Sequence, residues 1–257
     1  MYDRSLMRIA KSIGRYSLEQ ARKSLRKGLP IIVISYVFLF LTGLDYFPTY
    51  MILGKITPPA LFLAGIAFMY GLMQFLLPYR NWKSGLSGEK RVERNLSAKL
   101  NDEYSMYSDV LLKDKNRSGN IDHIVVGPTG IFVIETKNNE GNITYDRYGW
   151  KGMGENRNPI FQVNKNMFKV KDVLKNCDVF TDRNPYLKSI VVFSNSKAKL
   201  KIMNDPDYGC IIHQINSKED SGLAEIIKNE PVRFSNQEIK EIEHCLESGI
   251  GNWATRR

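Results

Sequence analysis

The alternation of apolar and polar positions divides this chain into two unlike parts. Residues 30–44 and 59–77 are uncharged, strongly apolar stretches joined by a short loop. A helix that is apolar around its whole circumference is typical of a buried or membrane-spanning helix, and the second stretch is long enough to cross about 30 Å of hydrocarbon. The pattern therefore predicts two transmembrane helices within residues 29–78. Two buried core helices are the alternative.

From residue 79 onward, segments in which apolar residues have the spacing of a helix alternate with segments in which they have the spacing of a strand. A helix is predicted over residues 88–100, and a second helix follows Pro159 with apolar positions at helical spacing. A capping box at Ser235 opens a last helix that runs through Leu246. Strands are predicted over residues 104–112, 142–150, 187–194 and 210–215. This order indicates a mixed α/β domain over residues 79–257, with a core at about 85–216 and C-terminal helices over 217–250.

Residues 120–137 form two β-branched, apolar runs on either side of a Gly-Pro-Thr-Gly turn at 127–130. This pattern is typical of a β-hairpin with a short turn. If the proline and threonine are the two turn residues, Asp122 lies opposite Glu135. Side chains repeat every second residue along a strand, so Lys137 points to the same face. His123 points to the other face, and we interpret it as a structural residue or as a hydrogen-bond donor behind the site.

Two directly opposed carboxylates destabilise a sheet unless a cation, a shared proton or a salt bridge lies between them. Both faces of the hairpin are apolar, so Asp122 and Glu135 are expected at the rim of a buried sheet. Carboxylates and water are the usual ligands of Mg²⁺. Lys137 could orient or deprotonate a water molecule, or contact a phosphate. The alternative is an Asp-Glu-Lys cluster that only solvates the strand end.

The formal net charge of +10 is concentrated near the apolar stretches. Residues 1–28 contain eight Lys and Arg and two acids, and their apolar positions suit an amphipathic helix on an anionic leaflet. Basic segments on both sides of the hairpin predict that both termini and the domain at 79–257 face the cytoplasm. Because more than half of the excess charge lies in residues 1–28, the high pI is not evidence for nucleic-acid binding.

Three widely spaced cysteines and three histidines give neither a disulfide framework nor a zinc motif. This agrees with a reducing cytoplasm. The chain also lacks a Walker A glycine loop, so ATP hydrolysis is not indicated.

An ordered set of short motifs extends from about Gly85 to Asn176 and includes a G-x-x-G-E sequence, an Ile-Asp-His sequence and an E-x-K element. The motifs are Gly85-Leu86-Ser87-Gly88-Glu89, Ile121-Asp122-His123, Gly130 to Lys137, Gly141-Asn142-Ile143, Trp150 and Asn158 to Gln162. This set resembles the nuclease-related domain (NERD) family of the PD-(D/E)xK nuclease superfamily. The resemblance implies a restriction-endonuclease-like mixed sheet flanked by helices.

The resemblance also implies roles for individual residues. Asp122 and Glu135 match the two metal-binding acids, and Thr136 would lend its backbone carbonyl to the metal. Lys137 matches the lysine of the E-x-K element. Two further residues complete the implied site: Glu89, with Glu93 one turn later as the alternative, and the helical Gln162.

The motifs and the apolar stretches together indicate two classes of function. The first is a membrane-anchored nuclease that uses Mg²⁺ or Mn²⁺ to hydrolyse phosphodiester bonds of nucleic acid, with DNA as the expected substrate. The second is a membrane-tethered nucleic-acid-binding or signalling module that keeps the fold without turnover. In both cases the expected partners are nucleic acid and the lipid bilayer, while protein partners are unknown. Both place the chain in the cell membrane.

Overall fold

The computed structural model describes residues 26, 28–34, 36, 57–112, 120–153, 158–175, 177–206 and 209–250. These residues fall into two compact units, one within residues 14–86 and one that includes Ser87 and all later described residues. The boundary lies inside the helix α3 (Thr57–Ser97), which contributes to both.

The unit within residues 14–86 contains a helical stretch around residues 28–34 and the first part of α3. The two approach each other closely at Gly71, where an added Cβ would lie 3.0 Å from the side chain of Ile31. Large apolar side chains are exposed along α3, among them Phe62, Ile66 and Met69.

The predicted transmembrane hairpin is not confirmed. Among the residues that the structure describes, no helix combines the length and the apolar character needed to span a bilayer. Most of the first predicted span, most of the loop after it and most of the basic segment at 1–28 lie outside the described residues.

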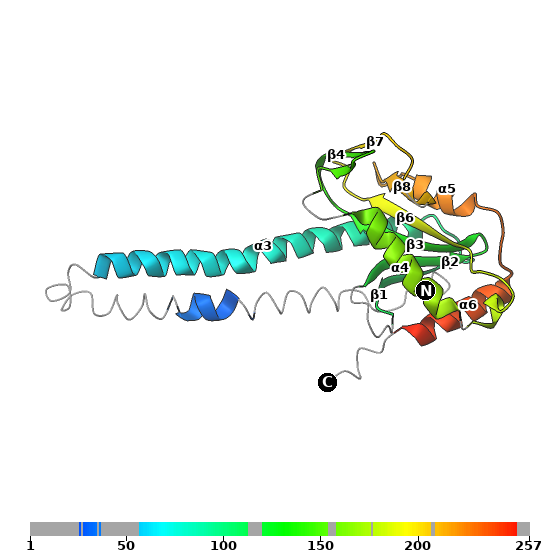
Figure 1. The fold of residues 1–257 in the computed structure, drawn as a ribbon, viewed down its shortest axis with the longest axis horizontal. Helices are drawn as coiled ribbons and strands as arrows, with labels where there is room; N and C mark the ends of the chain where they lie inside the picture. The colour runs from blue at the N-terminus through cyan, green and yellow to red at the C-terminus, as the bar shows by residue number, and fades with distance from the viewer. Residues whose placement is uncertain are drawn as a thin grey trace, which may run out of the picture. The chain divides into compact units, whose positions relative to one another are not determined.

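The second unit is built on a five-stranded mixed sheet in the order β1-β2-β3-β6-β8. The first three strands are antiparallel, whereas β6 and β8 run parallel to β3. Figure 1 shows the strands in this order. Their bounds are β1 (Ser105–Val110), β2 (Ile121–Gly127), β3 (Gly130–Lys137), β6 (Leu187–Phe193) and β8 (Ile211–Gln214). The predicted mixed α/β fold is confirmed.

The hairpin of β2 and β3 has the predicted register, with Gly127 paired to Gly130 and Ile124 to Val133. Its tip is fixed from outside, because the buried hydroxyl of Thr129 donates to the carbonyl of Ile227 at 2.7 Å. The tight turn is therefore anchored to the helical segment that contains Ile227. The turn and this contact together set the register of β2 and β3.

Helices cover both faces of this sheet (Figure 1). The helices α4 (Pro159–Leu174) and α6 (Asn236–Gly249) pack on the face that carries Ile124 and Val133. The end of α3 and the short α5 (Gly222–Lys228) pack on the face that carries Val125 and Phe132. The predicted capping box of α6 is present.

A second, three-stranded sheet has the order β5-β4-β7, and its residues Ile143, Tyr145 and Ala198 belong to the core on the side of α4 and α6. The strands β4 (Gly141–Asp146) and β5 (Gly149–Lys151) are antiparallel, and they agree with the predicted short strands at 142–150. The strand β7 (Ala198–Ile202) was not predicted, because its lysine-rich sequence gives no apolar run. It pairs in parallel with β4.

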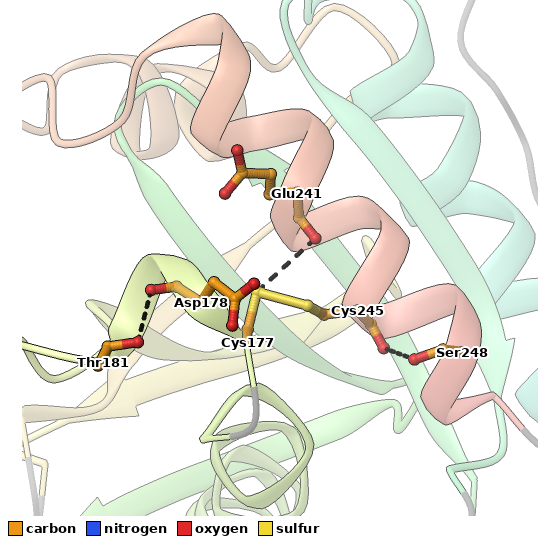
Figure 2. The surroundings of a disulfide bond; sticks show 6 residues. All are labelled: Cys177, Asp178, Thr181, Glu241, Cys245 and Ser248. Carbon is orange, nitrogen blue, oxygen red and sulfur yellow. Dashed lines mark hydrogen bonds between the residues drawn. A yellow bond between two sulfur atoms is a disulfide. The ribbon is translucent and has the colours of Figure 1, made fainter.

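The cysteines differ from expectation. Cys177, which precedes the 3₁₀-helix η1 (Asp178–Phe180), forms a disulfide with Cys245 in α6, with 5.9 Å between their Cα atoms (Figure 2). Cys210 is free and buried. The expectation of no disulfide was therefore wrong, because the two cysteines are 68 residues apart and only the packing of α6 brings them together. One of the arguments for a cytoplasmic location is lost with it, since disulfides are rare in cytosolic proteins.

Candidate active site

Three strands place carboxylates in one row across the sheet. Asp122 is the second residue of β2, and the register of the hairpin puts it opposite Glu135 of β3, just beyond the last regular pair. On the other side of β2, Asp109 of β1 lies between the pairs that flank Asp122. All three are buried, with exposed fractions of 9%, 6% and 6%.

At Asp122, a side-chain hydrogen bond replaces the regular backbone pairing of the hairpin. Its Oδ2 accepts a hydrogen bond from the backbone N–H of Thr136 at 2.7 Å. This bond fixes the carboxylate beside the end of β3, although burial and the nearby carboxylates of Glu135 and Glu89 raise its pKa well above the usual value. The hydrogen bond opposes that shift without cancelling it.

Lys137 is the cation of the cluster. Its Nζ donates to Oε1 of Glu135 at 2.7 Å and to Oε1 of Gln162 at 2.6 Å. Gln162 lies in the first turn of α4, which begins at Pro159 and is capped by Asn158. The fold thus brings the acid, the lysine and the glutamine of the predicted set into direct contact.

Glu89 reaches the cluster from α3. Burial raises its pKa to about 7, followed in size by the repulsion of Asp109 and Glu135. The pKa of Glu93 is also raised, first by burial, but the charges that act on it are Lys90 and Arg94. Of the two helical glutamates proposed for the site, Glu89 therefore interacts with the acids on the sheet.

Asp109 is the acid that sequence reasoning missed. It has φ = 52°, a left-handed conformation that is uncommon for residues other than glycine. Its Oδ1 accepts a hydrogen bond from the side chain of Asn120 at 2.6 Å, and its charge raises the pKa of Glu89. A strained backbone at a buried acid is typical of functional sites. The available signal was a Ser-Asp pair that interrupts the predicted strand.

Gly88, the residue before Glu89, lies where there is no room for a side chain. A Cβ at this position would lie 2.7 Å from Oγ of Ser194 and 2.8 Å from Cβ of Asn138. Both neighbours follow strand ends at the same edge of the sheet. Only glycine lets α3 approach this edge closely enough to bring Glu89 to the acids.

His123 lies behind the site on the opposite face from Asp122, as predicted. It is buried, and its Nδ1 is 2.9 Å from the hydroxyl of Ser108. Burial lowers its pKa to about 4, while the backbone carbonyl of Glu89 acts in the other direction. Nε2 of His123 is buried and makes no hydrogen bond within the described residues.

Whether this cluster can bind a metal ion depends on its donors. No group of three or more His, Cys, Asp or Glu side chains in the described part of the chain is arranged to hold an ion. Burial is the first cause of the raised pKa values of Asp122 and Glu89, and the neighbouring carboxylates raise them further. Lys137 is the lysine that contacts these acids within the described residues. Mg²⁺ is commonly bound by one or two carboxylates and several waters. A site for Mg²⁺ or Mn²⁺ at this cluster would therefore need only Asp122 and Glu135 as side-chain ligands, with water as the remaining ligands.

Comparison with known proteins agrees with the sequence motifs. Residues 84–194 match the model of the nuclease-related domain (NERD) family. An uncharacterized protein of Bacillus anthracis is 45% identical over 62 residues, which is 23% of this chain and 28% of that protein. The aligned part thus spans less than a third of that relative. No solved structure matches the chain.

The family match covers β1 to β6 and includes Glu89, Asp122, Glu135, Lys137 and Gln162. It ends at Ser194, before β8 and the last two helices. Residues 84–194 of this chain are therefore a nuclease-related domain.

Proposed function

We propose that this protein is a metal-dependent nuclease that hydrolyses phosphodiester bonds, with DNA as its substrate. The observation that carries the proposal is the meeting of Asp122, Glu135 and Glu89 with Lys137 at one edge of the sheet. Carboxylates repel a phosphate, so Asp122 and Glu135 would need a cation to act on a phosphodiester, and Mg²⁺ or Mn²⁺ would supply it.

Asp122 and Glu135 would bind the metal, with the backbone carbonyl of Thr136 and Glu89 as further ligands. When bound, the ion would polarise a phosphoryl oxygen and lower the pKa of a coordinated water. Lys137 would then exchange its bond to Glu135 for the phosphate or for the attacking water. Gln162 holds the lysine ammonium group in place for this exchange, because its bond to Nζ does not involve the acids.

A non-catalytic nucleic-acid-binding module is the second candidate. The ion pair between Lys137 and Glu135 favours it. Lys137 forms an ion pair with Glu135 at 2.7 Å, and the backbone N–H of Thr136 donates a hydrogen bond to Asp122. In this arrangement the lysine itself neutralises part of the negative charge. The cluster could then persist as a structural unit that needs no metal.

Incubating the full chain with labelled DNA separates the two candidates. We expect cleavage of duplex or single-stranded DNA with Mg²⁺ or Mn²⁺, and none with EDTA, because the acids need the ion to approach a phosphate. Gel electrophoresis of the products measures it, with RNA of the same sequence as a test of substrate class. DNA binding without cleavage at any divalent ion would support the module instead.

We further propose that the unit within residues 14–86 attaches the protein to a lipid bilayer. Along α3, Phe62, Ile66, Met69, Met73 and Leu76 are between 43% and 71% exposed, at helical spacing. Exposed apolar surface of this kind marks a membrane or protein interaction site.

Flotation on a density gradient tests this attachment. The full chain is expected to float with vesicles that contain anionic lipid, whereas a variant with aspartate at Phe62, Ile66 and Met69 should remain at the bottom. A chain with aspartate at the exposed neutral positions Thr181, Asn204 and Gln237 carries the same added charge and is the control. Equal flotation of all three proteins would contradict the proposal.

A further inference from the structure

A cavity of about 560 Å³ lies beside α3, outside the acid cluster. It is lined by the exposed cations Arg91, Arg94 and Lys218 and by polar residues, with Ile215 as its apolar member. The polar lining residues are Ser87, Asn95, Ser196, Asn216 and Ser217. No acidic residue is among the described residues that line it.

The cations in this cavity remain available to a ligand. Arg91 donates to the backbone carbonyl of Ser194, and Arg94 donates through Nε to the carbonyl of Lys90 at 3.1 Å. These bonds go to neutral carbonyls and not to carboxylates. None of the ion pairs within the described residues involves Arg91, Arg94 or Lys218.

The wall that carries Lys218 is fixed in place. Lys99 donates to the carbonyl of Lys218 at 3.0 Å and also to the carbonyl of Asp220. Asn95, which is buried, donates from Nδ2 to the same carbonyl of Asp220 at 2.8 Å. The loop after β8 is thus held against α3, so the cavity is formed before a ligand enters.

One residue connects the cavity to the strand end that carries Lys137. The backbone N–H of Ser194 donates to the carbonyl of Lys137 at 2.8 Å, and the carbonyl of Ser194 accepts from Arg91. Ser196, two residues later, lines the cavity. Ser194 thus links the backbone at Lys137 to a residue that lines the cavity.

We propose that this cavity binds a second phosphate of the nucleic-acid strand, apart from the phosphate at the acid cluster. The inference rests on the proposed function for its substrate. Guanidinium groups and ammonium groups bind phosphate through charge-assisted hydrogen bonds. The serines and asparagines around them are suited to phosphate and sugar oxygens. The cavity thus positions the strand, while the acid cluster does the chemistry.

The test measures binding of labelled DNA to the full chain in EDTA, so that cleavage does not interfere. We compare the wild type with Arg94→Gln, Lys218→Gln and the double variant, across about 50–200 mM salt. Each lost phosphate contact is expected to reduce the slope of log affinity against log salt by about 0.9, hence by about 1.8 in the double variant. Lys240→Gln, an exposed cation on α6 at the other face of the sheet, is expected to leave the slope unchanged.

The outcomes separate the cavity from the proposed function. If the variants at Arg94 and Lys218 reduce the salt slope of DNA binding but the wild type cleaves no DNA in Mg²⁺, the result would support the cavity assignment and count against the nuclease. Cleavage by the wild type with unchanged salt slopes in both single variants would overturn the cavity assignment. A free 5′-mononucleotide that binds at Arg94 and Lys218, while the DNA slope stays the same in the double variant, would also overturn it.

Discussion

Asp122→Asn is expected to lower metal-dependent cleavage by the full chain about 10³-fold. The substitution keeps the shape of the side chain and its acceptor for the Thr136 N–H, but it removes the negative charge that a divalent ion requires. A bound metal contributes several kcal/mol to the stabilisation of the transition state, and each 1.36 kcal/mol corresponds to a factor of about ten in rate. Initial rates of DNA cleavage in Mn²⁺ measure the effect.

A matched control is available on α4. Asp172→Asn makes the same chemical change in an exposed ion pair with Lys175, which contributes at most about 1 kcal/mol to stability. Its cleavage rate is expected to equal that of the wild type. Titration calorimetry provides a second readout, because Mn²⁺ uptake should be lost in Asp122→Asn and kept in Asp172→Asn. Unaltered metal binding by Asp122→Asn would exclude this residue as a ligand.

Without metal, the protein is expected to become less stable as the pH rises from about 5 to 8. The pKa of Glu89 is raised to about 7 and that of Asp122 is raised as well, first by burial in both cases. The folded state therefore binds more protons than the unfolded state in this range, and the free energy of unfolding falls with increasing pH. One pKa unit corresponds to about 1.4 kcal/mol, so Glu89 alone contributes a loss on the order of 3 kcal/mol.

Thermal unfolding in EDTA at a series of pH values measures this loss. Glu89→Gln should flatten the profile, because it removes one titrating group and its repulsion of Asp122. Glu247→Gln, at an exposed position on α6, is the control and should keep the wild-type profile. Added Mn²⁺ should stabilise the wild type by about 2.7 kcal/mol at 100 times its Kd, most strongly above pH 7. If the midpoint temperature of unfolding in EDTA stays constant or rises from about pH 5 to 8, the raised pKa values of Glu89 and Asp122 are refuted.

Local sequence was sufficient for the elements that depend on near neighbours. The turn at 127–130 and the two-residue period of the flanking strands set the register of the hairpin, and with it the placement of Asp122 opposite Glu135. Pro159 and the capping box at Ser235 marked the starts of α4 and α6. The contact between Lys137 and Gln162 was expected only as part of the family resemblance, and the fold brings the two together.

Other features required contacts between distant segments. The membrane hairpin was predicted from two uncharged apolar stretches and the charges that flank them, and it is not confirmed in the described residues. The strand β7 has no apolar pattern and exists because β4 offers a parallel edge. The cavity at Arg94 arises where the loop after β8 meets α3, more than a hundred residues away in sequence.

The sequence by itself determined which residues alternate on β2 and β3, because the side-chain period of a strand is a local property. Only the tertiary structure decided that Asp109 joins the acids and that Cys177 meets Cys245, since each depends on how separate elements pack. It also brings Glu89 within the influence of the charges of Asp109 and Glu135, whereas Glu93 is influenced by Lys90 and Arg94. Both lie on one face of the helix, and the close approach of α3 at Gly88 brings the first of them to the sheet.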